Sequence, residues 1–236
     1  MRINRKQSFF IALILVAILP IVFLIIFANI RHPEINSETI LPIYGEKYIV
    51  ETKLSDGKLR TDTVYHTIPH FSLINQNGDT VTDQRMRGVV SVADFFFTTC
   101  PDMCIDMAKN KRKIQEAFKE DNSKFQIFSF SVNPDFDTPD KLKKYAYEND
   151  VNSDTWSLLT GNKPEIYNLA RKGFLVTATV GDGGPNDFIH DNKFVLIDRD
   201  LRIRGYYDGT SEAETDKLIQ DIKKLLVSYV ITRKNK

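Results

Sequence analysis

Both cysteines of this 236-residue chain lie in one short stretch, FFFTTCPDMCIDM. Cys100 and Cys104 stand four positions apart, directly after an apolar run. Such a pair can form a structural disulfide, exchange electrons as a dithiol, or bind a soft metal ion through two thiolates. A disulfide that closes so small a loop removes little chain entropy, which argues against a purely structural bridge.

The spacing of the pair suits a shared metal ion at least as well as a disulfide. Residues i and i+4 of a helical turn hold their Cβ atoms about 5 to 6 Å apart, whereas a disulfide needs about 3.5 to 4.5 Å. Two thiolates that each lie about 2.3 Å from one ion need less approach. The N–H groups and dipole of a helix that starts here are expected to lower the thiol pKa values.

A third ligand has to come from elsewhere in the chain, and His190 is the best candidate. It lies between the glycine-rich loop GDGG and the apolar run KFVLID. In a thioredoxin-like order of elements this loop faces the cysteine turn. His66 and His70 flank Pro69, which disfavours a shared helix, so they are weaker candidates. Two thiolates and one neutral imidazole form a soft, low-coordinate set that suits Cu(I) and accepts Cu(II).

The elements that must position these residues alternate between strand and helix patterns. A hairpin is expected around Asn77-Gly78, and a helix with one apolar face follows the cysteines. Thr138-Pro139 has the N-cap and first-turn residues of another helix. The further expected elements are strands over residues 89–97, 125–132 and 156–159, helices over 163–172 and 212–228, an extended segment over 174–180 and a hairpin over 193–207. This order predicts an α/β protein with a thioredoxin-like fold, in which helices flank a central mixed sheet.

The N-terminal region predicts a membrane anchor. Residues 9–28 carry no charge, and at about 1.5 Å per residue a helix of this length spans the roughly 30 Å hydrocarbon core. We expect a transmembrane helix over residues 8–28, with a cleaved signal peptide as the alternative. The expected order is then a cytoplasmic N-terminus over 1–7, a stalk with a marginal hairpin over 29–65, a domain over 66–230 and a basic tail over 231–236.

The distribution of charge indicates the compartment of the protein and the classes of partner to expect. Arg2, Arg5 and Lys6 precede the apolar run, so the positive-inside rule places the domain outside the cytoplasm. The short segment before the anchor lacks a transit sequence, which favours a bacterial inner membrane. A net charge of +1 gives no reason to expect a nucleic-acid partner.

The cysteine motif CPDMC, the segment SVNPDFDTP over residues 131–139 and His190 before KFVLID together resemble the Sco/SenC family. The resemblance covers residues 68–228. It implies a membrane-anchored, thioredoxin-like protein that helps to build the dinuclear copper centre of cytochrome c oxidase. It also implies copper ligands at Cys100, Cys104 and His190. Asp135 and Asp137 match acidic positions of the family, but turn and N-cap chemistry explains them equally well.

The resemblance leaves two functions to compare. A copper metallochaperone would bind one copper ion and pass it to the copper-bearing subunit of the oxidase. A thiol-disulfide oxidoreductase would instead use Cys100 and Cys104 as a redox-active pair to reduce the cysteines of the acceptor. Other copper chaperones and thioredoxin-like reductases are further candidate partners.

Overall fold

The computed structural model describes residues 18–20, 22, 41–53, 59–100, 103–121, 123–176 and 192–234. The chain divides into two compact units, Met1–Ile40 and Leu41–Lys236. Across the described residues, no helix is long and apolar enough to cross a membrane. The transmembrane helix expected over residues 8–28 lies outside the described residues, apart from residues 18–20 and 22, which are helical.

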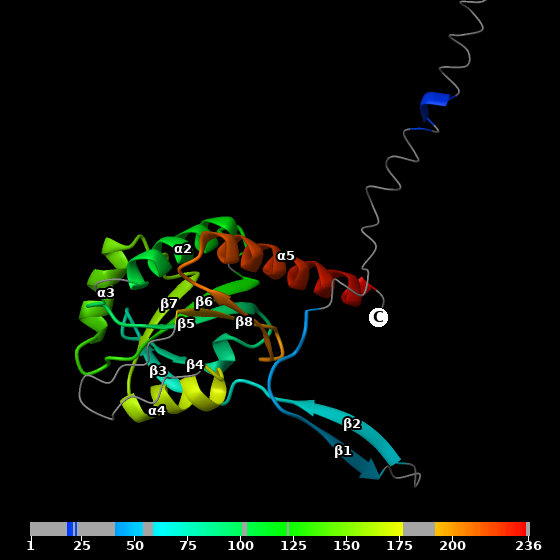
Figure 1. Cartoon of the computed structure of the whole chain (residues 1–236), viewed down its shortest axis with the longest axis horizontal. Helices are drawn as coiled ribbons and strands as arrows, with labels where there is room; N and C mark the ends of the chain where they lie inside the picture. Colours follow the sequence, from blue (N-terminus) through cyan, green and yellow to red (C-terminus); the bar gives the residue numbers. More distant parts are fainter. Residues whose placement is uncertain are drawn as a thin grey trace, which may run out of the picture. The chain divides into compact units, whose positions relative to one another are not determined.

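The described part of the second unit contains a seven-stranded mixed sheet with the order β4-β3-β7-β6-β5-β8-β9 (Figure 1). Its strands are β3 (Ser72–Asn75), β4 (Thr80–Thr82), β5 (Val90–Phe96), β6 (Phe125–Ser131), β7 (Trp156–Thr160), β8 (Lys193–Ile197) and β9 (Ile203–Asp208). The strands β5, β6 and β7 pair in parallel, whereas β8 runs antiparallel to β5. The predicted central mixed sheet is therefore confirmed.

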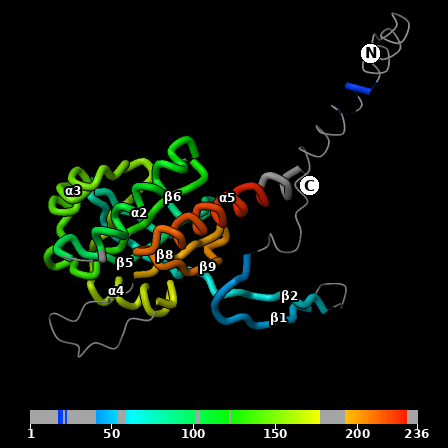
Figure 2. The backbone as a smooth tube through the Cα atoms, turned by 45° about the horizontal axis from the view of Figure 1, so that its top comes forward, coloured from blue at the N-terminus to red at the C-terminus, as the bar shows by residue number. Residues whose placement is uncertain are grey.

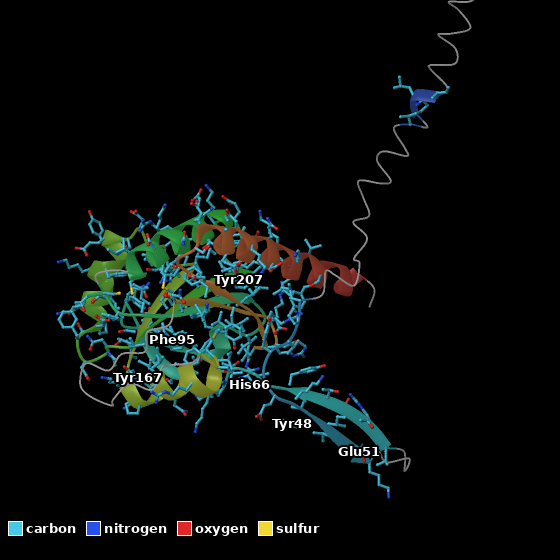
Figure 3. All side chains as sticks on the ribbon, in the orientation of Figure 1. Tyr48, Glu51, His66, Phe95, Tyr167 and Tyr207 are labelled. Carbon is cyan, nitrogen blue, oxygen red and sulfur yellow. The ribbon has the colours of Figure 1, made fainter. Side chains whose placement is uncertain are left out.

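The strand β5 lies inside the sheet, between β6 and β8. All seven of its residues are buried. A strand covered on both faces needs apolar residues at nearly every position, which explains the run VVSVADFFF. Phe95 lies within this interior (Figure 3). The cysteine turn therefore directly follows a fully buried strand.

Helices cover both faces of the sheet (Figures 1 and 2). The helices are α2 (Met103–Ala117), α3 (Pro139–Glu148), α4 (Lys163–Asn168) and α5 (Glu212–Lys234). Side chains of α2, α3 and α5 pack on one face, and α4 with the π-helical turn Leu169–Gly173 packs on the other. Met107, Ile114 and Phe118 are buried, as the predicted apolar face of α2 requires. The helix α5 continues to Lys234, past the boundary at residue 230 expected from the sequence.

Two local predictions from turn and cap residues are confirmed. Gly78 has a φ of 85° in the tight turn between β3 and β4, a region of backbone conformation that favours glycine. The helix α3 has Thr138 at its N-cap and Pro139 at its first position. The Thr138 side chain makes no capping hydrogen bond, so the proline and the extended backbone at Thr138 mark this helix start.

A separate two-stranded hairpin precedes the sheet. It consists of β1 (Lys47–Lys53) and β2 (Leu59–Tyr65), and every residue of β1 is exposed. Tyr48 and Glu51 lie on this exposed strand (Figure 3). The structure confirms that residues 29–65 contain a hairpin. An isolated pair of strands gains little stability from packing.

Candidate functional site

Cys100 and Cys104 lie where β5 ends and α2 begins. The backbone N–H of Cys100 donates a hydrogen bond to the carbonyl of Phe97 over 3.3 Å, which closes the turn after the strand. The helix begins at Met103, so Cys100 precedes it and Cys104 lies in its first turn. The geometry of a helical turn, considered for the pair from its spacing, therefore applies to Cys104 and not to Cys100. Cys104 is 7% exposed and Cys100 is half-buried.

The two thiols are free and in contact through a hydrogen bond. Burial, followed by this hydrogen bond, raises the pKa of Cys104. The backbone of Phe97 and the positive charge of Lys111 act in the opposite direction but are outweighed. The expected lowering of the pKa by the helix N-terminus does not hold for Cys104, because desolvation disfavours its thiolate more strongly. The geometry is nevertheless that of two adjacent sulfur donors.

Asp137 fixes the turn that carries Cys100. Its fully buried carboxylate accepts hydrogen bonds from the backbone N–H of Thr98 over 3.1 Å and from the Thr98 hydroxyl. It also accepts one from the hydroxyl of Ser131, at the end of β6, over 2.5 Å. Asp137 thus ties the cysteine turn to the neighbouring strand, whereas Asp135 is exposed.

A buried ion pair lies under α2, and the sequence analysis missed it. The Nζ of Lys111, which is 1% exposed, lies 2.6 Å from Oδ2 of Asp94 and 3.1 Å from Oγ of Ser129. The Ser129 hydroxyl donates to Oδ1 of Asp94 over 2.5 Å and accepts from the indole N–H of Trp156 over 2.9 Å. These bonds use the donor and both acceptor positions of the hydroxyl, so the serine is fully satisfied.

The lysine belongs to the same face of α2 as Cys104. Lys111 follows Cys104 by seven positions, and its ammonium lies 5.0 Å from the ring centroid of Phe96 and 4.9 Å from that of Trp156. A sequence signal for it existed, because positions spaced by three and four along a helix share one face. The row on this face is Cys104, Met107, Lys111, Ile114 and Phe118. A lysine in that row, with an aspartate inside the buried strand β5, indicates an internal ion pair.

The structure brings Cys100 and Cys104 together, while His190 lies outside the described residues. Where side chains are described, no three His, Cys, Asp or Glu residues gather at metal-binding distance. The Nε2 of His66 lies 2.7 Å from the carbonyl oxygen of Gly173 (Figure 3). The Nδ1 of His70 lies 2.5 Å from Oδ1 of Asp83. Both weaker candidates thus make other contacts, and the third ligand stays a prediction.

Comparison with known proteins gives consistent matches. Residues 60–227 match the SCO1/SenC family model. The SCO1 protein homolog of Bacillus subtilis is 32% identical over 168 residues, which cover 71% of this chain and 86% of that protein.

Two solved structures are similar in fold. One is BsSco, which is described with a disulfide switch as a member of the Sco family of cytochrome c oxidase assembly proteins. It is 32% identical with a TM-score of 0.59, and the match covers 68% of this chain and 93% of that chain. Copper-bound ScoI of Bradyrhizobium japonicum has 25% identity and a TM-score of 0.55, with 67% of this chain and 99% of that chain covered. These similarities confirm the mixed α/β, thioredoxin-like fold. Since the family match also covers well over half of its length, the chain belongs to the SCO1/SenC family.

Proposed function

We propose that this protein is a copper chaperone. It binds one copper ion through Cys100, Cys104 and His190 and delivers it to the dinuclear copper centre in the copper-bearing subunit of cytochrome c oxidase. The observation that carries the proposal is the contact between two free thiols at the start of α2. Membership of the SCO1/SenC family and the similarity to a copper-bound ScoI support copper as the cargo.

The chemistry of the pair suits a monovalent, soft ion. Thiolates select Cu(I), and two neighbouring ones can share a single ion. Binding releases the thiol protons, so the raised pKa of Cys104 makes proton and copper compete for the same sulfur. A site with only two or three ligands leaves room for a ligand of the acceptor. Delivery by stepwise ligand exchange is therefore part of the proposal.

The sheet topology supports His190 as the third ligand. The strand β8 begins at Lys193 and runs antiparallel to β5, with Val195 paired to Ala93. The chain therefore enters β8 at the same edge of the sheet where it leaves β5 for the cysteine turn. His190 precedes β8 by three positions.

The uncharged N-terminal run supports membrane anchoring as a further part of the proposal. The anchor would hold the thioredoxin-like domain at the outer surface of a bacterial inner membrane. Other copper chaperones are the proposed source of the metal. Thioredoxin-like reductases are the proposed source of electrons that keep both thiols reduced.

The direct test is an anaerobic Cu(I) titration of the full chain in detergent, against a chelator of known affinity. We expect wild-type protein to bind one ion, Cys100→Ser and Cys104→Ser to lose tight binding, and His190→Ala to bind more weakly. The matched control is His70→Ala, because that imidazole is paired with Asp83. Wild-type affinity in His190→Ala would remove the histidine from the site, and one-to-one binding without either cysteine would refute the proposal.

A thiol-disulfide oxidoreductase is the second candidate function. The observation in its favour is that both thiols are free and that their side chains interact. This function needs the cysteine pair alone. We expect His190→Ala to keep wild-type rates of thiol exchange with a model dithiol and to lose copper affinity. A defect in oxidase assembly in this variant would separate copper delivery from cysteine reduction.

A further inference from the structure

A surface cavity of about 220 Å³ adjoins the cysteine turn, and the proposed copper site does not use it. The cavity lies between this turn, the loop after β6 and the exposed side of α3. Its lining consists of Thr98, Phe136, Lys141, Lys144, Tyr145 and Glu148. Aromatic and charged side chains thus meet in one hollow beside the reactive sulfurs.

One exposed aromatic ring of this lining contacts one ammonium, and that ammonium has no acidic partner among the described residues. Phe136 is 41% exposed, although a ring of this size is usually buried. The Nζ of Lys141 lies 3.2 Å from the centroid of that ring. No carboxylate of the described residues forms an ion pair with Lys141. A carboxylate that enters the cavity would therefore find a cation without a competing acid.

The other charged residues of the lining do not cancel this preference. Lys144 pairs with Glu148 over 3.6 Å, with both side chains largely exposed. Such a surface pair contributes little stability and can open at low cost. The lining then carries two ammonium groups and one carboxylate, which leaves a net positive charge. Charge complementarity favours an acidic ligand over a basic one.

Tyr145 connects the cavity to the cysteines. Its ring packs on that of Phe96, the last residue of β5, at a centroid distance of 5.3 Å. Burial raises the pKa of Tyr145, so its phenol belongs to the interior side of the cavity wall. The wall of the cavity is thus in contact with the end of the strand that leads into the cysteine turn. A segment bound in the cavity lies next to the cysteine turn.

We propose that this cavity docks an acidic segment of the protein that receives the copper, with a carboxylate against Lys141 and an apolar side chain against Phe136. This inference rests on the proposed function, because it assumes an acceptor that must approach Cys100 and Cys104. Docking beside the sulfurs holds the acceptor ligands close to the metal during exchange.

The test uses the full, metal-free chain in zwitterionic detergent and two cysteine-free hexapeptides, acetyl-GEFEGG-amide and acetyl-GKFKGG-amide. Amide chemical shifts are followed at low ionic strength, where exposed charges act most strongly. We expect the acidic peptide to shift the signals of Thr98, Phe136 and Lys141, and the basic peptide to leave them unchanged. We expect Lys141→Glu to weaken binding of the acidic peptide about fivefold. Phe136→Ala also weakens it.

Lys143→Glu is the matched control, because Lys143 is an exposed lysine of the same helix that does not line the cavity. It changes the net charge of the protein equally and should change the affinity less than about twofold. Equal binding of both peptides, or equal effects of Lys141→Glu and Lys143→Glu, would overturn the docking site. The peptide experiment contains no copper, so its result can be interpreted even if the copper titration fails. If the protein binds copper normally but the cavity binds both peptides equally, only the docking inference is overturned.

Discussion

Replacement of Lys111 by methionine tests whether the buried ion pair is integral to the fold. Asp94 is fully buried, and the ammonium of Lys111 lies 2.6 Å from its carboxylate. Lys111→Met leaves this buried carboxylate without its cation, with the Ser129 hydroxyl as its other side-chain hydrogen bond among the described residues. Removal of one partner from a buried pair costs about 3 to 5 kcal/mol in the free energy of unfolding. For a domain of this size the expected fall in Tm is about 6 to 20 °C.

The assay is urea unfolding of the compact unit Leu41–Lys236, followed by the fluorescence of Trp156. This is the only tryptophan of the chain, and its indole N–H donates to Ser129 beside the ion pair. The double variant Asp94→Leu/Lys111→Met removes both charges, so we expect it to regain at least half of the loss. The control is Lys113→Met on the same helix.

Lys113 pairs with Glu212 and Asp216 at the surface, so its replacement should cost no more than about 1 kcal/mol. The reasoning is refuted if Lys111→Met unfolds at the same urea concentration as the wild type. It is also refuted if the double variant is less stable than Lys111→Met, because the remaining charge would then not be the source of the loss. A changed slope of unfolding against urea would point to an altered unfolded state instead.

Three further predictions concern the cysteine turn and pH. Asp137→Ala removes the acceptor of the hydrogen bonds from Thr98 and Ser131. We expect the free energy of unfolding in urea to fall by about 1 to 3 kcal/mol and Cu(I) binding to weaken. Unchanged copper affinity would show that the turn keeps its shape without the carboxylate. The apparent copper affinity should rise about tenfold per pH unit for each thiol proton displaced between pH 6 and 8, and a flat profile in chelator competition would contradict protonated thiols. The pKa values of Cys104 and Tyr145 are raised above their ordinary 9.0 and 10.0, so the unfolded chain loses these protons at lower pH than the folded chain. The free energy of unfolding should therefore fall above about pH 9, by up to about 1.4 kcal/mol per pH unit for each group. Equal stability at pH 8 and 10.5 would refute the burial of these groups.

The elements with strong local signals were predictable from the sequence. The run VVSVADFFF is typical of a strand covered on both faces, and β5 is that strand. The turn at Gly78 and the helix start at Pro139 follow from residues whose backbone preferences hold in any context. The parallel pairing of β5 with β6 follows from the helix between them, because parallel strands need such crossovers.

The electrostatics of the cysteine turn was not predictable in the same way. The sequence indicated a helix N-terminus at the cysteines, and this local effect favours a thiolate. The pKa of Cys104 is raised instead, because the packing of α2 against the sheet removes that sulfur from water. The ion pair between Lys111 and Asp94 likewise joins two elements that only the folded chain brings together. Tertiary burial outweighs local propensity in both cases.

Because the two sulfurs are buried to different extents, they differ in their access to solvent. A molecule that arrives from solvent reaches Cys100 more easily, since Cys104 is only 7% exposed and Cys100 is half-buried. An alkylating reagent, an oxidant or the thiol of another protein will therefore begin its reaction at the outer sulfur. In the proposed copper transfer, we expect an acceptor to displace Cys100 first and Cys104 last.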